Sequence, residues 1–148
     1  MIAEALLTVI VHATPATQPM PALTRYESVS SERGWRPSLY RGKWFRKSVE
    51  PIRKCIGTRE SHFQYMMSNG GAYQFMSGWK PSAGAWMLKR EIRQRQGRAA
   101  ANHAWHVLAS HPFSQWSRWA QDALFYTVWR NGAGRHHWDP VVPGTGCF

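Results

Sequence analysis

The sequence is poor in acidic residues, poor in cysteine and without a long apolar run. Among its 148 residues, 8 are Asp or Glu against 19 Lys or Arg, which gives a net charge of +11 with His neutral. No apolar stretch reaches the roughly 18 residues that a membrane-spanning helix needs. The 2 cysteines exclude a disulfide-dense miniature scaffold and a four-thiolate zinc site. What remains is a chain of about one domain's length.

Basic and aromatic residues are abundant instead. Hydrophobic residues make up 43% of the chain, enough for a packed core, and 9 Trp and 5 Tyr are present. Such rings often line sites that stack on sugars or bases. The pI near 10.5 implies an anionic partner, for which nucleic acid, anionic lipid surfaces and bacterial cell walls all qualify. Basic clusters at 33–54 and 89–98 either bind such a partner or are solvated faces.

The first 43 residues are expected to form an extended N-terminal arm or linker. Residues 2–11 are an apolar run followed by Ala and Pro, which resembles a weak signal peptide with Glu4 where a basic residue is expected. The alternative is an arm that docks on another subunit. Residues 12–45 are rich in Pro, Ser, Gly and Arg, which indicates irregular structure rather than a second domain.

Residues 44–148 have the pattern of a mainly α-helical domain. Ser48 is a suitable N-cap for a first helix that runs to about Glu60. Residues 63–79 combine glycines with aromatic residues, which predicts a loop or short hairpin, followed by a turn at Pro81.

The second half of this domain contains three further apolar faces at helical spacing. They predict a basic helix over 85–99, another helix over 101–108, and a last one with Ser114 as its cap. Gly132 is expected to end the last helix. Residues 135–148 form a tail rich in Pro and Gly.

Glu60 is the carboxylate best placed for chemistry. It lies at the end of an apolar helix, just before the aromatic segment 63–79. Packing against aromatic rings desolvates a carboxyl group, and desolvation favours the protonated form that a general acid needs. The structural alternative is an ion pair with Arg59 or Lys54.

Four other carboxylates follow residue 45. Glu50 fits the first turn of a helix, and Glu91 is expected to pair with Arg95 within a basic run. Asp122 is expected on the polar side of its helix, and Asp139 precedes a proline in the tail. None of these four carboxylates has a histidine at a sequence spacing typical of metal ligands, so we expect no metal and no cofactor.

Three segments form an ordered pattern along the chain. The first is Cys55-Ile-Gly-Thr-Arg-Glu60-Ser61, the second is 71–75 (GAYQF) with Trp79, and the third runs from Gln121 through Gly132 and Trp138 to Cys147. Together they resemble lysozyme-like muralytic domains, namely the resuscitation-promoting factors of actinobacteria and transglycosylase-like domains of phage lysins and tail proteins. Such domains place a catalytic Glu, followed by Ser, at the end of their first helix.

The resemblance covers residues 44–148 and implies a lysozyme-like fold, α+β with little strand, in one small domain. It also implies a disulfide between Cys55 and Cys147, whereas two unpaired thiols are the alternative. Two departures stand out. His62 and Phe63 replace two glycines that often follow Glu-Ser, so the local turn is expected to differ. The middle segment is longer than in compact members and adds the basic helix.

The activity implied by the resemblance is cleavage of the β-1,4 bond between N-acetylmuramic acid and N-acetylglucosamine in peptidoglycan, with Glu60 as general acid. The motif segments contain no convincing second carboxylate, which favours a route in which the muramic 6-hydroxyl attacks. Asp122 and Asp139 remain partners for a hydrolase route. Candidate substrate-binding residues are Ser61, Tyr65, Tyr73, Gln74, Phe75, Trp79 and Trp138. Each Trp and Tyr has a core role as its alternative.

The expected partners are peptidoglycan glycan strands and, through residues 1–43, other virion subunits at a phage tail. The location would be a virion or the extracellular cell wall, outside the reducing cytoplasm. Two rival functions stay open. One is a structural or wall-binding virion protein that keeps the fold without activity. The other is a basic nucleic-acid-binding module, although we do not expect nucleic acid to be the partner.

Overall fold

The computed structural model describes residues 22–24, 35–68, 70–75, 79–139 and 146–148. Across these ranges the chain forms three α-helices, α2 (Glu50–Ser61), α3 (Pro81–Ala109) and α4 (Arg118–Trp129). Short 3-10 turns η1 to η5 join them: Lys47–Val49, Gly71–Tyr73, Phe113–Gln115, Arg130–Gly132 and Arg135–His137. The β pairing found in these ranges is one isolated bridge between Thr24 and Trp116. The predicted mainly α class is therefore confirmed.

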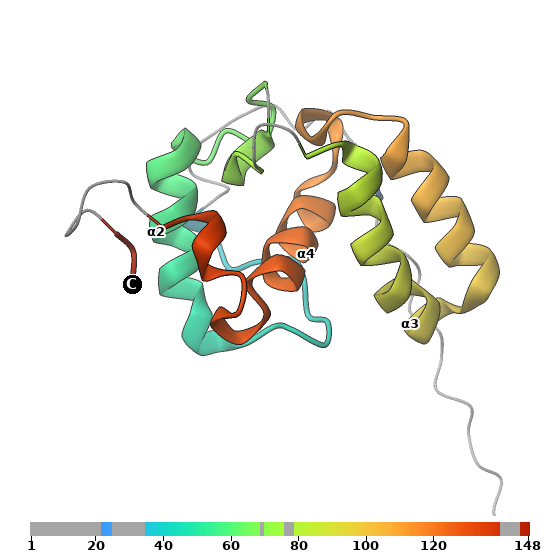
Figure 1. The fold of residues 1–148 in the computed structure, drawn as a ribbon, viewed down its shortest axis with the longest axis horizontal. Coiled ribbons are helices and arrows are strands. Elements are labelled where there is room, and N and C mark those ends of the chain that lie inside the picture. The colour runs from blue at the N-terminus through green and yellow to red at the C-terminus, as the bar shows by residue number, and fades with distance from the viewer. Residues whose placement is uncertain (1–21, 25–34, 69, 76–78, 140–145) are drawn as a thin grey trace, which may run out of the picture.

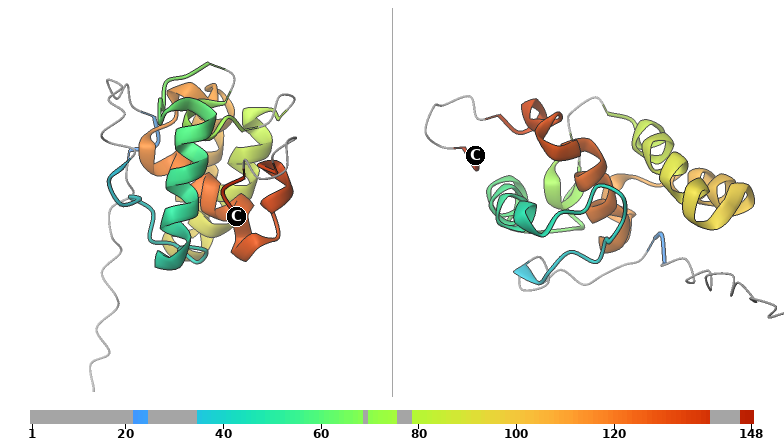
Figure 2. Two further views of the ribbon diagram at one scale, coloured as in Figure 1. Left: turned by 90° about the vertical axis from the view of Figure 1, so that its left-hand side faces the viewer. Right: turned by 90° about the horizontal axis from the view of Figure 1, so that it is seen from below.

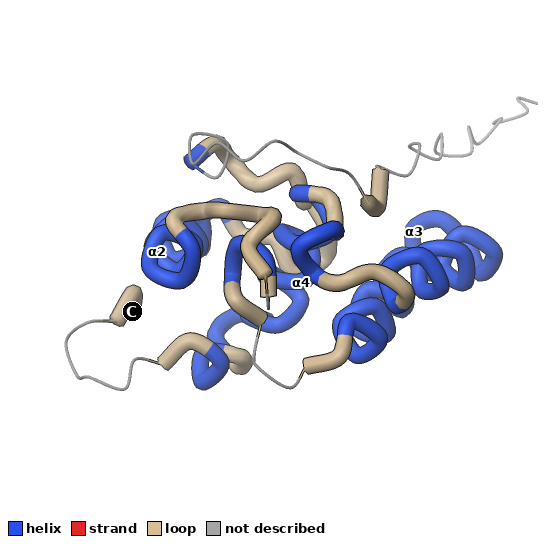
Figure 3. The backbone as a smooth tube through the Cα atoms, turned by 90° about the horizontal axis from the view of Figure 1, so that it is seen from above, coloured by secondary structure: helices blue, strands red, loops and turns tan. Residues whose placement is uncertain are grey.

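Helix α4 forms the centre of the domain, with α2 on one side and α3 on the other (Figures 1, 2 and 3). Eleven of its 12 residues are buried, including the charged Asp122. A helix that is buried on all sides has no face exposed to solvent. The expectation that Asp122 lies on a polar side is thus wrong, because the segment before α2 and the loop after it cover that side as well.

Helix α2 begins at Glu50, and a proline occupies its first turn. The predicted cap Ser48 lies instead inside the 3-10 turn η1, and the N-cap position is Val49, whose side chain makes no capping bond. The helix ends where His62 and Phe63 take left-handed backbone angles, φ 52° and 58°. These residues therefore adopt the conformation that glycine favours at such a turn.

Helix α3 is two helical segments joined at Gly97, whose φ of 86° and ψ of 176° are not helical. The chain reverses there, and the segments run side by side (Figure 1). Contact between them is direct, because the Lys89 ammonium lies 5.2 Å from the centre of the Trp105 ring. The prediction of two successive helices agrees with this hairpin. Pro81, however, begins α3 rather than forming a turn.

Helix α4 begins after Ser117, whose hydroxyl accepts the Ala120 N–H at 3.2 Å. The predicted cap, Ser114, lies in the preceding 3-10 turn η3. The helix ends at Trp129, before the predicted glycine stop, because Arg130 takes a left-handed conformation with φ 44°.

Residues 35–43 pack into the domain, although the sequence places them in the arm. Ser38 and Tyr40 are each 1% exposed. Leu23 is also buried, and its carbonyl accepts the Ser117 N–H at 2.8 Å. The boundary predicted at 43/44 therefore falls inside packed structure. The remainder of the predicted arm, residues 1–21 and 25–34, lies outside the described residues.

Candidate functional site

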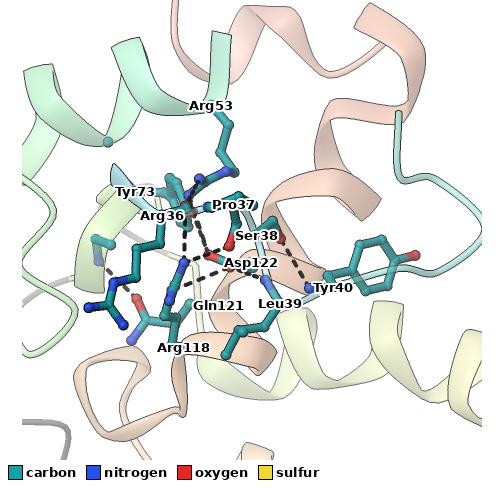
Figure 4. A network of polar contacts seen from close by, with 12 residues as sticks. Arg36, Pro37, Ser38, Leu39, Tyr40, Arg53, Tyr73, Arg118, Gln121 and Asp122 are labelled. Atoms are coloured by element: carbon teal, nitrogen blue, oxygen red, sulfur yellow. Dashed lines mark hydrogen bonds and ion pairs between the residues drawn. The ribbon is translucent and has the colours of Figure 1, made fainter. Parts of the chain in front are cut away.

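A buried polar network around Asp122 holds α2, α4 and the chain before α2 together (Figure 4). The Tyr65 and Tyr73 hydroxyls donate to Asp122 Oδ1 at 2.8 and 2.5 Å. Arg53 and Arg118 place guanidinium nitrogens 3.8 and 3.9 Å from the same carboxylate. Asp122 and Arg53 are both fully buried, so their charges are screened by the protein groups around them rather than by water.

The network also fastens the backbone of residues 36–39. Arg53 and Arg118 donate to the Arg36 carbonyl at 2.8 and 3.1 Å, and the Leu39 N–H donates to Asp122 Oδ2 at 3.1 Å. Burial raises the pKa of Tyr73, and the Asp122 charge raises it further. Its hydroxyl therefore stays protonated and keeps donating.

Gln121 fixes the segment after α2. Its Oε1 accepts the Ala72 N–H at 2.8 Å, and its Nε2 donates to the carbonyls of Tyr65 and Phe113, both at 2.8 Å. Gly71 has φ +66°, and a Cβ there would come within 2.1 Å of the Gln121 amide oxygen. One amide side chain from α4 therefore holds both ends of the segment 65–72.

Glu60 lies in the last turn of α2 and is partly exposed, with 26% of its side chain accessible. Arg59 donates to Glu60 Oε1 from Nε at 3.0 Å and from Nη2 at 2.7 Å. The same Nη2 donates to the Trp138 carbonyl at 2.6 Å. The structural alternative considered for Glu60, a pair with Arg59, is thus present, and it ties Glu60 to the chain near residue 138.

Cys55 and Cys147 lie at disulfide distance, with their Cα atoms 5.6 Å apart and 92 residues apart in sequence. This is the pairing that the resemblance implies. It brings the C-terminus alongside α2, one helical turn and a half before Glu60 (Figure 1).

Five of the predicted substrate-binding residues belong to the core. The sequence left core and ligand-contacting roles open for the aromatic residues, and the structure buries them with Ser61; they are Ser61, Tyr65, Tyr73, Phe75 and Trp138, each at most 5% exposed. Ser61 donates to the Ala72 carbonyl at 2.6 Å, and the Trp138 indole donates to the Tyr73 carbonyl at 3.0 Å. These side chains support the surface beside Glu60 from beneath.

Gln74 and Trp79 are the two candidates that remain partly exposed. Gln74 Nε2 donates to the Gly71 carbonyl at 2.9 Å and to the Ser68 carbonyl at 3.3 Å. The amide nitrogen of Gln74 therefore stabilises the loop that contains it. The Trp79 ring lies edge-on to His137 at 5.0 Å. Burial, then the His136 charge, lower the pKa of His137, so this ring stays neutral near pH 7.

The other carboxylates that the structure describes have partners of their own. Glu50 pairs with Arg53 at 2.8 Å, and Asp139 pairs with Arg135 at 3.3 Å near the surface. Glu91 pairs with Arg95 at 3.7 Å, as predicted.

Sequence reasoning missed a surface formed by Trp86 and Trp105 of α3. Trp86 is 64% exposed, whereas Ala85 and Leu88 of the same helix are buried. A tryptophan outside the apolar stripe of a predicted helix is the signal that could have indicated it.

None of the helices in the described ranges has both the length and the hydropathy to cross a membrane. Within the same ranges, no three His, Cys, Asp or Glu side chains are placed to share a metal ion. Comparison of the chain with protein-family models, curated proteins and solved structures finds no match.

Proposed function

We propose that the protein cleaves peptidoglycan glycan strands between N-acetylmuramic acid and N-acetylglucosamine, with Glu60 as its general acid and base. The observation that carries this proposal is the accessibility of Glu60. It is a partly exposed carboxylate in the last turn of α2, so a substrate can reach it once its ion pair with Arg59 opens. The sequence resemblance assigns catalysis to this glutamate, and the Cys55–Cys147 pair is in keeping with that resemblance.

The mechanism follows from one carboxylate acting twice. Protonated Glu60 gives its proton to the glycosidic oxygen as the bond from C1 to that oxygen breaks. The 6-hydroxyl of the muramic residue forms the new bond to C1, and its proton passes to the Glu60 carboxylate. The products are a free 4-hydroxyl and a 1,6-anhydro end, and Glu60 returns to its protonated form.

A single-carboxylate route suits the surroundings of Glu60. Glycosidases that use water place a second carboxylate about 5 to 9.5 Å from the first. Asp122, one partner considered for that role, has no exposed surface and is occupied by tyrosine hydroxyls. Asp139 is exposed and pairs with Arg135, so it is the remaining candidate for a hydrolase route.

A phage virion, at the tail, is the setting we propose, with residues 1–43 docking on other virion subunits. The net charge of +11 suits a cell wall that bears anionic groups. Ser38 and Tyr40 of this segment are buried in the domain, so their side chains are not available for docking.

Mass spectrometry of a peptidoglycan digest tests the reaction. Anhydro-muropeptides are the expected product. Reducing ends would instead indicate a hydrolase and direct attention to Asp139. Absence of soluble products from the walls of several bacteria would contradict the enzymatic proposal and favour a wall-binding or structural protein.

A further inference from the structure

Three tryptophans and two lysines form an open surface on the α3 side of the domain. Trp79, Trp86 and Trp105 line a depression of about 610 Å³ together with Lys80. Lys89 lies over two of these rings, 5.3 Å from the Trp86 centre and 5.2 Å from the Trp105 centre. We name this surface the tryptophan groove. Trp79 and Trp105 are partly buried against the core, whereas Trp86 is exposed.

The exposed Trp86 is costly unless a partner covers it. Its exposed fraction, 64%, is the highest among the large hydrophobic residues that the structure describes. Stacking of a flat apolar face on a water-exposed indole ring is favourable, because both surfaces leave the water. Sugar rings present such a face through their C–H bonds, and nucleic-acid bases present one through their π system.

The charge around the tryptophan groove is positive. A second depression of about 310 Å³ shares Trp86 with it and is lined by Lys43, Arg90 and Arg130. Glu91 is the acidic residue at that depression, and its carboxylate already accepts hydrogen bonds from the Tyr40 hydroxyl and the Lys43 N–H. The surface therefore matches a partner with both ring faces and negative charges.

A chain of contacts connects the tryptophan groove to Glu60. The Trp79 ring touches His137, at 5.0 Å between ring centres, and the next residue is Trp138. The Trp138 carbonyl accepts from Arg59, which also holds Glu60. One edge of the tryptophan groove and the residues that hold Glu60 are therefore joined by direct contacts.

We propose that the tryptophan groove binds a distal part of the peptidoglycan strand, with sugar faces on Trp86 and Trp105 and the carboxylates of the stem peptides near Lys80 and Arg90. This proposal rests on the proposed function and specifies its substrate as a long, peptide-bearing strand. The contacts that join Trp79 to the residues around Glu60 favour the glycan over single-stranded nucleic acid, because the glycan is the substrate of the proposed reaction at Glu60.

Sedimentation with purified sacculi tests the proposal in a Glu60→Gln background, so that bound wall is not digested. Trp86→Ala is compared with Leu39→Ala, because Leu39 is also exposed, at 51%, and lines neither of the two depressions. Trp86→Ala is expected to raise the dissociation constant by about tenfold, as loss of one aromatic anchor does, and Leu39→Ala to leave it unchanged.

Charge is tested with Lys80→Gln against Lys47→Gln on three wall preparations, because Lys47 is exposed and lines neither depression. Sacculi freed of accessory anionic polymers should bind as intact ones do, and sacculi stripped of stem peptides should bind more weakly. The difference between Lys80→Gln and Lys47→Gln should vanish on peptide-free glycan. If binding is lost when the accessory polymers are removed but not when the stem peptides are removed, the assignment of the partner is overturned.

Three other results would also overturn the proposal. They are equal effects of Trp86→Ala and Leu39→Ala, no binding by the parent protein, and a single-stranded oligonucleotide that displaces the wall in a Trp86-dependent manner. The proposed reaction is judged separately from digest products. Anhydro products without groove-dependent binding would leave the reaction standing, and groove-dependent binding without products would leave a wall-binding protein.

Discussion

Arg59 donates two hydrogen bonds to one carboxylate oxygen of Glu60 and a third to the Trp138 carbonyl. The ion pair is partly solvated, with side chains 27% and 26% exposed, so it contributes little to stability, about 0.5 kcal/mol. The bond from the guanidinium to a carbonyl contributes more, about 1.5 kcal/mol.

These magnitudes predict different effects for the two residues. Glu60→Gln should change the free energy of unfolding by less than about 0.5 kcal/mol, since an amide oxygen can still accept from Arg59. Arg59→Ala should lower it by about 1 to 2 kcal/mol, because the Trp138 carbonyl loses its charged donor. Urea unfolding followed by tryptophan fluorescence measures both. A large loss in Glu60→Gln would show that Glu60 has a structural role.

The buried carboxylate of Asp122 should be essential for folding. Asp122→Asn removes the carboxylate that faces Arg53 and Arg118 inside the protein, although Glu50 still pairs with Arg53. Because Arg118 loses this buried ion pair, we expect a loss of about 3 to 5 kcal/mol in unfolding free energy. Asp139→Asn is the matched control, because its pair with Arg135 is exposed and should cost less than about 0.5 kcal/mol. Equal stabilities of the two variants in urea would contradict the network of Figure 4.

Glu50 should make stability depend on acid pH. Burial alone would raise its pKa, but hydrogen bonds from Arg53 and Tyr126 lower the pKa below the usual 4.5. The unfolded chain therefore binds the proton more tightly, so the contribution of Glu50 is complete above about pH 4.5 and is lost as pH falls through the lower folded value. The loss of stability between about pH 5 and pH 3 should be smaller in Glu50→Gln than in the parent protein. Identical pH profiles would contradict this assignment.

His62 should tolerate glycine. It is exposed and has a φ of 52°, a region that costs a non-glycine residue about 1 kcal/mol. His62→Gly should therefore raise the melting temperature, or at least leave it unchanged, whereas His62→Val should lower it because a β-branched side chain fits that region poorly. Thermal unfolding by circular dichroism compares them. A higher melting temperature for the valine variant would show that the turn differs.

The helices could be predicted from local sequence, because the apolar spacing that indicates a helix repeats within one or two helical turns. Apolar spacing indicated α2 and the two segments of α3, and glycines among aromatic residues indicated the loop after α2. The cysteine pairing came from the resemblance, not from spacing.

What escaped prediction depends on contacts distant in sequence. Asp122 meets Tyr65 and Leu39, which lie 57 and 83 residues away, so its helix gave no sign of burial. The same contacts draw residues 36–39 into the domain. The tryptophan groove likewise requires the reversal at Gly97 that places Trp105 beside Lys89.

The central claim is that Glu60 performs the chemistry, and the release of soluble muropeptides from purified sacculi tests it most directly. Wild type, Glu60→Gln and Asp139→Asn are compared at equal concentration, after their folded states are matched by circular dichroism. We expect Glu60→Gln to lose at least about a hundredfold in rate and Asp139→Asn to retain the wild-type rate. A Glu60→Gln protein that releases muropeptides as fast as wild type would contradict the account.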